Sequence, residues 1–106
     1  MSPSPAPDGT DPALPVVSVI TPTYNEAENL PILVERLHVA LAGVPHEIVV
    51  ADDDSPDRTW EVAESLAADD PTITVMRRFH DPGLSASVLD GMTVARGETL
   101  AVIDAD

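Results

Sequence analysis

Two aspartates one residue apart, Asp104 and Asp106, have the chemistry and spacing of a divalent-cation site. They follow the apolar run 100–103, so both carboxylates would stand at the end of a strand. Such hard oxygen ligands suit Mg²⁺ or Mn²⁺. A cation there could join the protein to the phosphates of a ligand and stabilise a departing diphosphate. The pair is therefore our candidate for metal binding and catalysis; the alternative is a polar cap between strand and loop.

A second acidic stretch, residues 52–57, is denser in carboxylates than a turn requires. Asp52 and Asp53 would end a second apolar run, where a carboxylate can accept hydrogen bonds from a ribose or a base. We interpret Ser55 and Pro56 as turn residues and Asp57 as the cap of the following helix.

The third stretch, residues 22–26, holds the only tyrosine of the chain, Tyr24. Its ring could stack on a base, and Glu26 could accept a hydrogen bond from the base or ribose edge, while Pro22 fixes the direction of the loop. The alternatives are a boundary aromatic at position 24 and a first-turn helical residue at position 26, where the helix dipole favours a carboxylate.

Two arginines, Arg77 and Arg78, follow a third apolar run. They could be solvated charges, or they could balance the negative charge of the acidic stretches and hold phosphate. We assign no role to His80, and we expect Trp60 to pack within the protein rather than against a ligand.

The 106 residues carry a formal net charge of −14 and include no cysteine. The missing thiols exclude disulfides and thiolate metal sites. The acidity argues against a nucleic-acid-binding surface, which needs clustered positive charge. It fits either a solvated acidic surface or adaptation to high salt, where screening relieves self-repulsion. If the midpoint temperature of thermal unfolding does not rise between low and molar KCl, that result would count against adaptation to high salt.

Apolar runs and helix signals alternate along the chain. Strands are expected at residues 16–21, 48–51, 73–76 and 100–103. Helices are expected after Asn29, Asp57 and Gly83. The inward face of the first helix would consist of Leu30, Leu33, Val34, Leu37 and Leu41; that of the second, of Val62, Ala63 and Leu66; and that of the third, of Leu84, Val88, Met92 and Ala95. Such alternation predicts an α/β fold, a Rossmann-like parallel sheet in strand order 3-2-1-4. Ligands bind such sheets beyond the carboxyl ends of the strands, so the three stretches should meet at one site.

The ends of the chain differ from its middle. Residues 1–15 contain five prolines and are expected to be a disordered tail. Residues 16–106 would form one domain, and because the sequence stops directly after the fourth expected strand we expect a fragment of a longer protein. A signal peptide and an apolar stretch of about 18 residues are both missing, so we expect a soluble module facing the cytoplasm.

From Val16 to Asp106 the chain resembles family 2 glycosyltransferases, specifically the dolichol- or polyprenyl-phosphate mannosyltransferases. The resemblance is carried by the P-T-Y-N-E stretch at 22–26, the D-D-D-S-P-D stretch at 52–57 and the D-A-D ending at 104–106. Further matches are Arg77 with Arg78, Gly83 to Ser85, Gly91 and residues 95–97.

The resemblance implies the N-terminal half of a GT-A fold and an inverting transfer of mannose from GDP-mannose to a polyprenyl-phosphate lipid at the cytoplasmic face of a membrane. Positions matching the nucleotide-binding residues are Pro22, Tyr24, Glu26, Ala51, Asp53 and Ala105, and those matching the metal-binding pair are Asp104 and Asp106. Family members continue well beyond the D-x-D motif, so we expect this chain alone to lack activity.

Four other interpretations remain. The first is a related transferase with another sugar or acceptor. The second is a dinucleotide oxidoreductase, disfavoured because no glycine-rich turn follows the first strand. The third is a phosphohydrolase whose nucleophile lies in the D-x-D motif, although that nucleophile normally begins a domain. The fourth is a non-catalytic remnant that binds nucleotide weakly.

Overall fold

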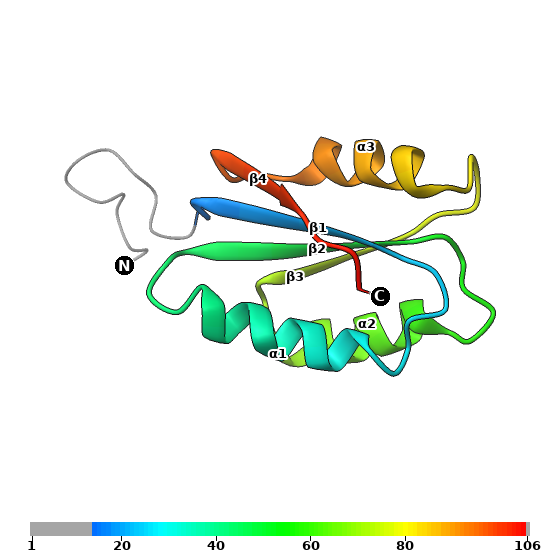
Figure 1. The fold of residues 1–106 in the computed structure, drawn as a ribbon, viewed down its shortest axis with the longest axis horizontal. Helices are drawn as coiled ribbons and strands as arrows, with labels where there is room; N and C mark the ends of the chain where they lie inside the picture. Colours follow the sequence, from blue (N-terminus) through cyan, green and yellow to red (C-terminus); the bar gives the residue numbers. More distant parts are fainter. Residues whose placement is uncertain (1–13, 106) are drawn as a thin grey trace, which may run out of the picture.

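The computed structural model describes residues 14–105, so most of the expected tail and Asp106 lie outside the described part. Four parallel strands form one sheet in the order β3-β2-β1-β4, which confirms the expected order. In chain order the elements are β1 (Val17–Thr23), α1 (Leu30–Ala40), β2 (His46–Asp52), α2 (Thr59–Asp69), β3 (Ile73–Arg77), α3 (Leu84–Val94) and β4 (Thr99–Val102). Figure 1 shows α1 and α2 on one face of the sheet and α3 on the other. Within residues 14–105, no helix is long and apolar enough to cross a membrane.

The two central strands are buried on both faces, which is why they appear in the sequence as continuous apolar runs. Ile20, Ile48, Val49 and Val50 are each 0% exposed. Both strands extend one or two residues beyond their expected apolar runs at their carboxyl ends. There the added polar residue Thr23 has an internal partner, because its hydroxyl donates to Asp52 at 2.6 Å.

Helix α1 buries the expected face. Leu30, Val34 and Leu37 are at most 6% exposed and pack against the sheet. Its first turn differs from expectation, because Asn29 occupies the N-cap position but its side chain caps no backbone N–H. The Asn29 amide instead donates to the Glu26 carboxylate at 3.1 Å.

Helix α2 begins one residue later than expected. Arg58, with φ +62°, occupies its N-cap position in place of Asp57. The Asp57 carboxylate still accepts from the first helical N–H, that of Thr59, at 3.0 Å and from the Thr59 hydroxyl at 2.5 Å. The aspartate therefore satisfies the helix end from one position further out.

The expected inward face of α3 is wrong. Leu84 is 60% exposed and Met92 is 42% exposed, whereas Ser87 and Gly91 are buried. The reason is close contact with β1: a Cβ added at Gly91 would lie 2.6 Å from Cγ2 of Ile20. Small side chains let the helix approach the sheet, and the larger apolar residues of α3 are turned outward.

A buried carboxylate joins three segments at the amino edge of the sheet. Glu47 in β2 is 2% exposed and accepts from the Ser18 hydroxyl at 2.6 Å and from the Arg96 backbone N–H at 2.6 Å. Ser18 in turn accepts from the Gly97 N–H at 2.7 Å. Burial opposes ionisation of Glu47, but the hydrogen bonds from Ser18 and Arg96 outweigh it and lower the pKa of Glu47. This network fixes the start of β4 beside β1.

Gly97 leaves no room for a side chain, since an added Cβ would lie 2.7 Å from the backbone nitrogen of Ser18. We therefore expect Gly97→Ala to lower the free energy of unfolding by about 1–3 kcal/mol through overpacking. The exposed neighbouring variant Glu98→Ala should change it by less than about 0.5 kcal/mol. Urea unfolding followed by circular dichroism measures both, and equal effects would contradict the packing argument.

Because folding lowers the pKa of Glu47, its contribution to stability is present above the unfolded-state value of 4.5 and is lost as pH falls through the folded-state value. Glu47→Gln should cost about 1–3 kcal/mol at pH 7, where the charged acceptor is present. The difference between wild type and variant should shrink below about pH 4. Urea unfolding at pH 7 and pH 3.5 tests this, and a pH-independent difference would show that the charge of Glu47 contributes nothing.

Candidate functional site

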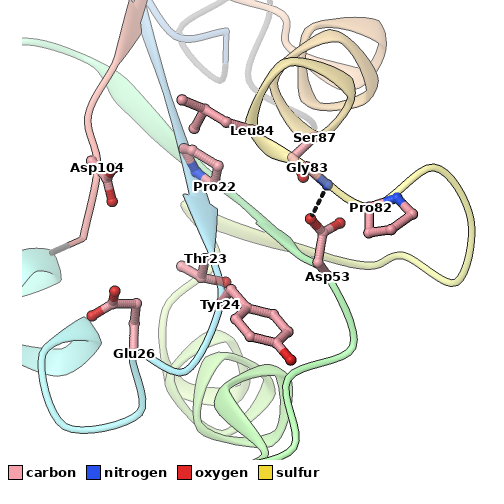
Figure 2. A pocket seen from close by; sticks show the side chains of 10 residues that line it. All are labelled: Pro22, Thr23, Tyr24, Glu26, Asp53, Pro82, Gly83, Leu84, Ser87 and Asp104. Carbon is pink, nitrogen blue, oxygen red and sulfur yellow. Dashed lines mark hydrogen bonds between the residues drawn. The ribbon is translucent and has the colours of Figure 1, made fainter.

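A pocket of about 470 Å³ opens at the carboxyl edge of the sheet. It lies where the loops after β1, β2 and β4 meet, beside the switch in strand order between β1 and β4. Figure 2 shows Glu26 and Asp104 on one side of it and Asp53 with Gly83 on the other. Its lining consists of Pro22, Thr23, Tyr24, Glu26, Asp53, Pro82, Gly83, Leu84, Ser87 and Asp104.

The loop after β1 is held by the loop after β2. The Asn25 N–H donates to the Ser55 hydroxyl at 3.0 Å, and the Glu26 N–H donates to the Thr59 hydroxyl at 2.9 Å. Asn25 has φ +57°, a left-handed conformation that an asparagine tolerates and that turns the chain back toward α1. Tyr24 is left 55% exposed in the pocket wall, so its ring is available to a ligand.

Asp52 is a structural residue, which corrects the expectation that it could meet a ligand. Its side chain is 0% exposed and accepts from the Thr23 hydroxyl at 2.6 Å, the Ser55 hydroxyl at 2.6 Å and the Ser55 N–H at 2.9 Å. These bonds tie the end of β1 to the loop after β2. Ser55 begins a turn, as expected, because the Arg58 N–H donates to the Ser55 carbonyl at 3.0 Å.

Asp53, the next residue, does face the pocket. One of its carboxylate oxygens is paired with the Arg78 guanidinium, and the other accepts from the Gly83 N–H at 2.8 Å. Figure 2 marks the contact with Gly83, at the start of α3. Its side chain is only 10% exposed, so the carboxylate has a fixed orientation.

The two arginines have different surroundings. Arg78 is not the solvated charge that one interpretation expected; it balances acidic charge, as the other interpretation expected, by pairing with Asp53 and Asp90. Arg78 is 3% exposed and is enclosed by protein acceptors. Arg77 is the last residue of β3; its guanidinium carbon lies 3.6 Å from the Trp60 ring centroid and its side chain pairs with Asp54 at 2.7 Å. Trp60 therefore contacts the protein, as expected. The sequence pattern could not show which of the two arginines is buried. Adjacent residues of a strand point to opposite faces, and the pattern does not show which face is covered at this position.

The segment after β4 is tied to β1. The Ile103 N–H donates to the Ile20 carbonyl at 3.0 Å, and the Thr21 hydroxyl donates to the Ile103 carbonyl. This brings Asp104 to the pocket, whereas Ala105 is 6% exposed and does not line it.

The donor atoms at this edge suit a hard divalent cation, because Asp104 and Glu26 present carboxylate oxygens to the same pocket. Between residues 14 and 105, no group of three or more His, Cys, Asp or Glu residues is arranged to hold a metal ion. Asp106, the second member of the expected pair, lies outside the described residues. A cation here would depend on Asp104, Asp106 and oxygens of the ligand.

The structure gathers five of the expected site residues in one pocket: Pro22, Tyr24, Glu26, Asp53 and Asp104. Ala51 is buried within β2 opposite Pro22 and does not line the pocket. The sequence analysis does not identify the wall of the pocket formed by residues 82–87, because it expects Gly83 only to open a helix. The start of a helix at the carboxyl edge of the sheet, beside an acidic strand end, was a usable signal for such a wall.

Comparison with known proteins gives consistent matches. Residues 18–106 match the family described as Glycosyl transferase family 2. A dolichol-phosphate mannosyltransferase of Pyrococcus furiosus is 53% identical over 90 residues, which cover 85% of this chain and 25% of that protein. A polyprenol monophosphomannose synthase of Mycolicibacterium smegmatis is 47% identical over 92 residues, which cover 83% of this chain and 34% of that protein. The structure of a mannosyltransferase from Pyrobaculum calidifontis, solved in complex with GDP-Man and Mn²⁺, is similar to this one, with a TM-score of 0.70 and 31% sequence identity. The match covers 88% of this chain and 28% of that protein.

This chain thus spans 25% to 34% of the length of those three proteins. The fold agrees with these matches, because the parallel sheet with helices on both faces is that of the N-terminal part of a GT-A glycosyltransferase.

The contrast between Asp52 and its neighbours is testable. Asp52→Asn replaces one acceptor oxygen by a donor group, so we expect it to lower the free energy of unfolding by about 2–3 kcal/mol. Asp54→Asn removes the same charge from an exposed ion pair and should cost less than about 1 kcal/mol. Chemical unfolding at pH 7 measures both, and a smaller effect at position 52 than at position 54 would refute the structural role.

Proposed function

The chain belongs to glycosyl transferase family 2, and from that premise we propose that residues 16–106 form the donor-binding part of an enzyme that transfers mannose from GDP-mannose to a polyprenyl phosphate. The observation that carries the proposal is the convergence of Tyr24, Asp53 and Asp104, from three separate strand ends, on one pocket. A pocket of about 470 Å³ is within the range of small-molecule sites.

Each of these side chains has a task in holding a nucleotide sugar. The exposed ring of Tyr24 offers a stacking surface for the base. The carboxylate of Asp53, held in a fixed orientation, offers acceptor lone pairs to N–H or O–H groups of the base or ribose. We assign Asp104 and Asp106 to the diphosphate, which they would hold through a divalent cation. Pro22 and Glu26 line the same pocket and complete the proposed donor set, whereas Ala51 and Ala105, expected from the resemblance, are buried and do not line it.

The sugar, the base and the acceptor rest on the relatives. One similar protein is named a dolichol-phosphate mannosyltransferase and another a polyprenol monophosphomannose synthase, and a similar solved structure contains GDP-Man and Mn²⁺. Their agreement supports mannose, guanine and a lipid phosphate for this chain. With a lipid acceptor, the reaction would take place at the cytoplasmic face of a membrane.

The proposed chemistry is a single displacement with inversion. A phosphate monoester is largely a dianion at pH 7, because its second pKa lies near 6, so it can attack the anomeric carbon without a strong general base. The protein would contribute by orienting the donor and by stabilising negative charge on the departing diphosphate. Mg²⁺ or Mn²⁺ held by Asp104 and Asp106 would supply positive charge at that diphosphate.

The binding of GDP-mannose to this chain tests the proposal. In calorimetric titration with Mn²⁺ present we expect saturable binding that is lost when EDTA removes the cation. Asp104→Asn should weaken binding at least about tenfold because it removes an anionic metal ligand. Tyr24→Ala should weaken it about tenfold through lost stacking.

Asp69→Asn is the matched control, because it removes one exposed charge at the far end of α2 and should leave the affinity unchanged. UDP-glucose serves as the competing donor: tighter binding of the uridine nucleotide would favour a related transferase with another sugar. We expect no transfer to a lipid phosphate by this chain alone. Failure to bind any nucleotide diphosphate sugar would refute the proposed site.

A further inference from the structure

One guanidinium near the pocket has more partners than an ordinary surface arginine. The side chain of Arg78 is 1% exposed. It pairs with Asp53 and donates to Asp90 at 2.8 Å, to the Ser87 hydroxyl at 2.9 Å and to the Asp81 carbonyl at 3.1 Å. These partners belong to the loop after β2, the segment before α3, and α3 itself.

Electrostatics explains why this group can be buried. An isolated buried guanidinium would be strongly destabilising, whereas one paired with carboxylates and fully hydrogen-bonded is tolerated. Burial alone would lower the pKa of Arg78, but the bonds with Asp90 and Asp53 raise it. The bond from Arg78 is also the main reason that the pKa of Asp90 is lowered. Arg78 is therefore buried as a cation.

The same contacts fix one wall of the pocket. The two oxygens of Asp53 are bound from two directions, by Arg78 and by the Gly83 N–H at 2.8 Å. Gly83 and Ser87 also line the pocket, and the Ser87 hydroxyl is itself held by Arg78. Arg78 is not among the residues that line this pocket. It therefore acts on the pocket through its neighbours.

We propose that Arg78 is a positioning residue of the donor site, which presets the Asp53 carboxylate against the start of α3 so that an incoming nucleotide meets an acceptor already in place. This inference rests on the proposed function. A preset acceptor binds more tightly than a mobile one because no rotamer entropy is lost on binding. A planar guanidinium suits this task because its donors reach Asp53, Ser87 and Asp90 at the same time, and a lysine at the same position can replace only part of these bonds.

The test is a double-mutant cycle on GDP affinity, measured with Mn²⁺ by calorimetry. Arg78→Gln should weaken GDP binding about tenfold in the wild-type background. In the Asp53→Asn background the same change should weaken it less than about threefold, because the carboxylate that Arg78 orients is already gone. Arg78→Lys keeps the charge and should give an intermediate loss.

The matched control is Arg77→Gln, which removes the same charge one residue away. Arg77 contacts Trp60 and Asp54 outside the pocket, so its loss should leave GDP affinity within about twofold of wild type. Urea unfolding of every variant separates affinity from stability. The double variant of Asp53 and Arg78 removes both charges of that pair, which avoids leaving the Asp53 carboxylate without its arginine partner if the single variant folds poorly.

A second readout needs no ligand. The Gly83 amide proton bonds to Asp53, so its chemical shift in ¹H–¹⁵N spectra should move in Arg78→Gln and in Asp53→Asn but not in Arg77→Gln. An unmoved Gly83 signal, or a GDP affinity that is equal in wild type and Arg78→Gln despite lower stability, would overturn the positioning role. Absence of GDP binding by the wild-type chain would instead overturn the donor site and this inference with it.

Discussion

Parallel pairing of β1 with both β2 and β4 determines where chemistry can occur in this chain, because it places the carboxyl ends of three strands at one edge. The residues beyond those ends could not form a pocket if they were free to move. Internal polar contacts remove that freedom: Asp52 joins the loops after β1 and β2, and Thr21 holds the segment after β4. The pocket is therefore a product of the sheet and of hydrogen bonds within the protein.

The fold could be predicted from the sequence because its signals are local. Continuous apolar runs mark buried parallel strands, and their alternation with helices leaves few topologies. The orientation of α3 could not be predicted, because apolar spacing alone does not show which face approaches a sheet. Here the contact between Gly91 and Ile20 determines it, a relation between residues 71 positions apart in sequence. The N-cap of α2 was misplaced by one residue for a similar reason, since Asp57 can bond to the first helical N–H from outside the helix.

The candidate site was predicted in part. Tyr24, Glu26, Asp53 and Asp104 were identified because their residue types stand at strand ends, and topology then brings them together. Adjacent carboxylates could not be separated by type: Asp52 is buried in structural bonds and Asp53 faces the pocket. The buried arginine that fixes the wall at the start of α3 could not be identified, because residue type and spacing do not distinguish Arg78 from the exposed Arg77.

The exposed apolar side chains of α3 have a consequence for association between copies of the chain. In the described residues β4 pairs only with β1, and its Leu100 and Val102 are 41% and 52% exposed beside the outward apolar residues of α3. Such a sheet edge is a template for association between molecules. The net charge of −14 keeps copies apart in dilute buffer. In molar salt, where the screening length falls to about 3 Å, that repulsion between copies is lost.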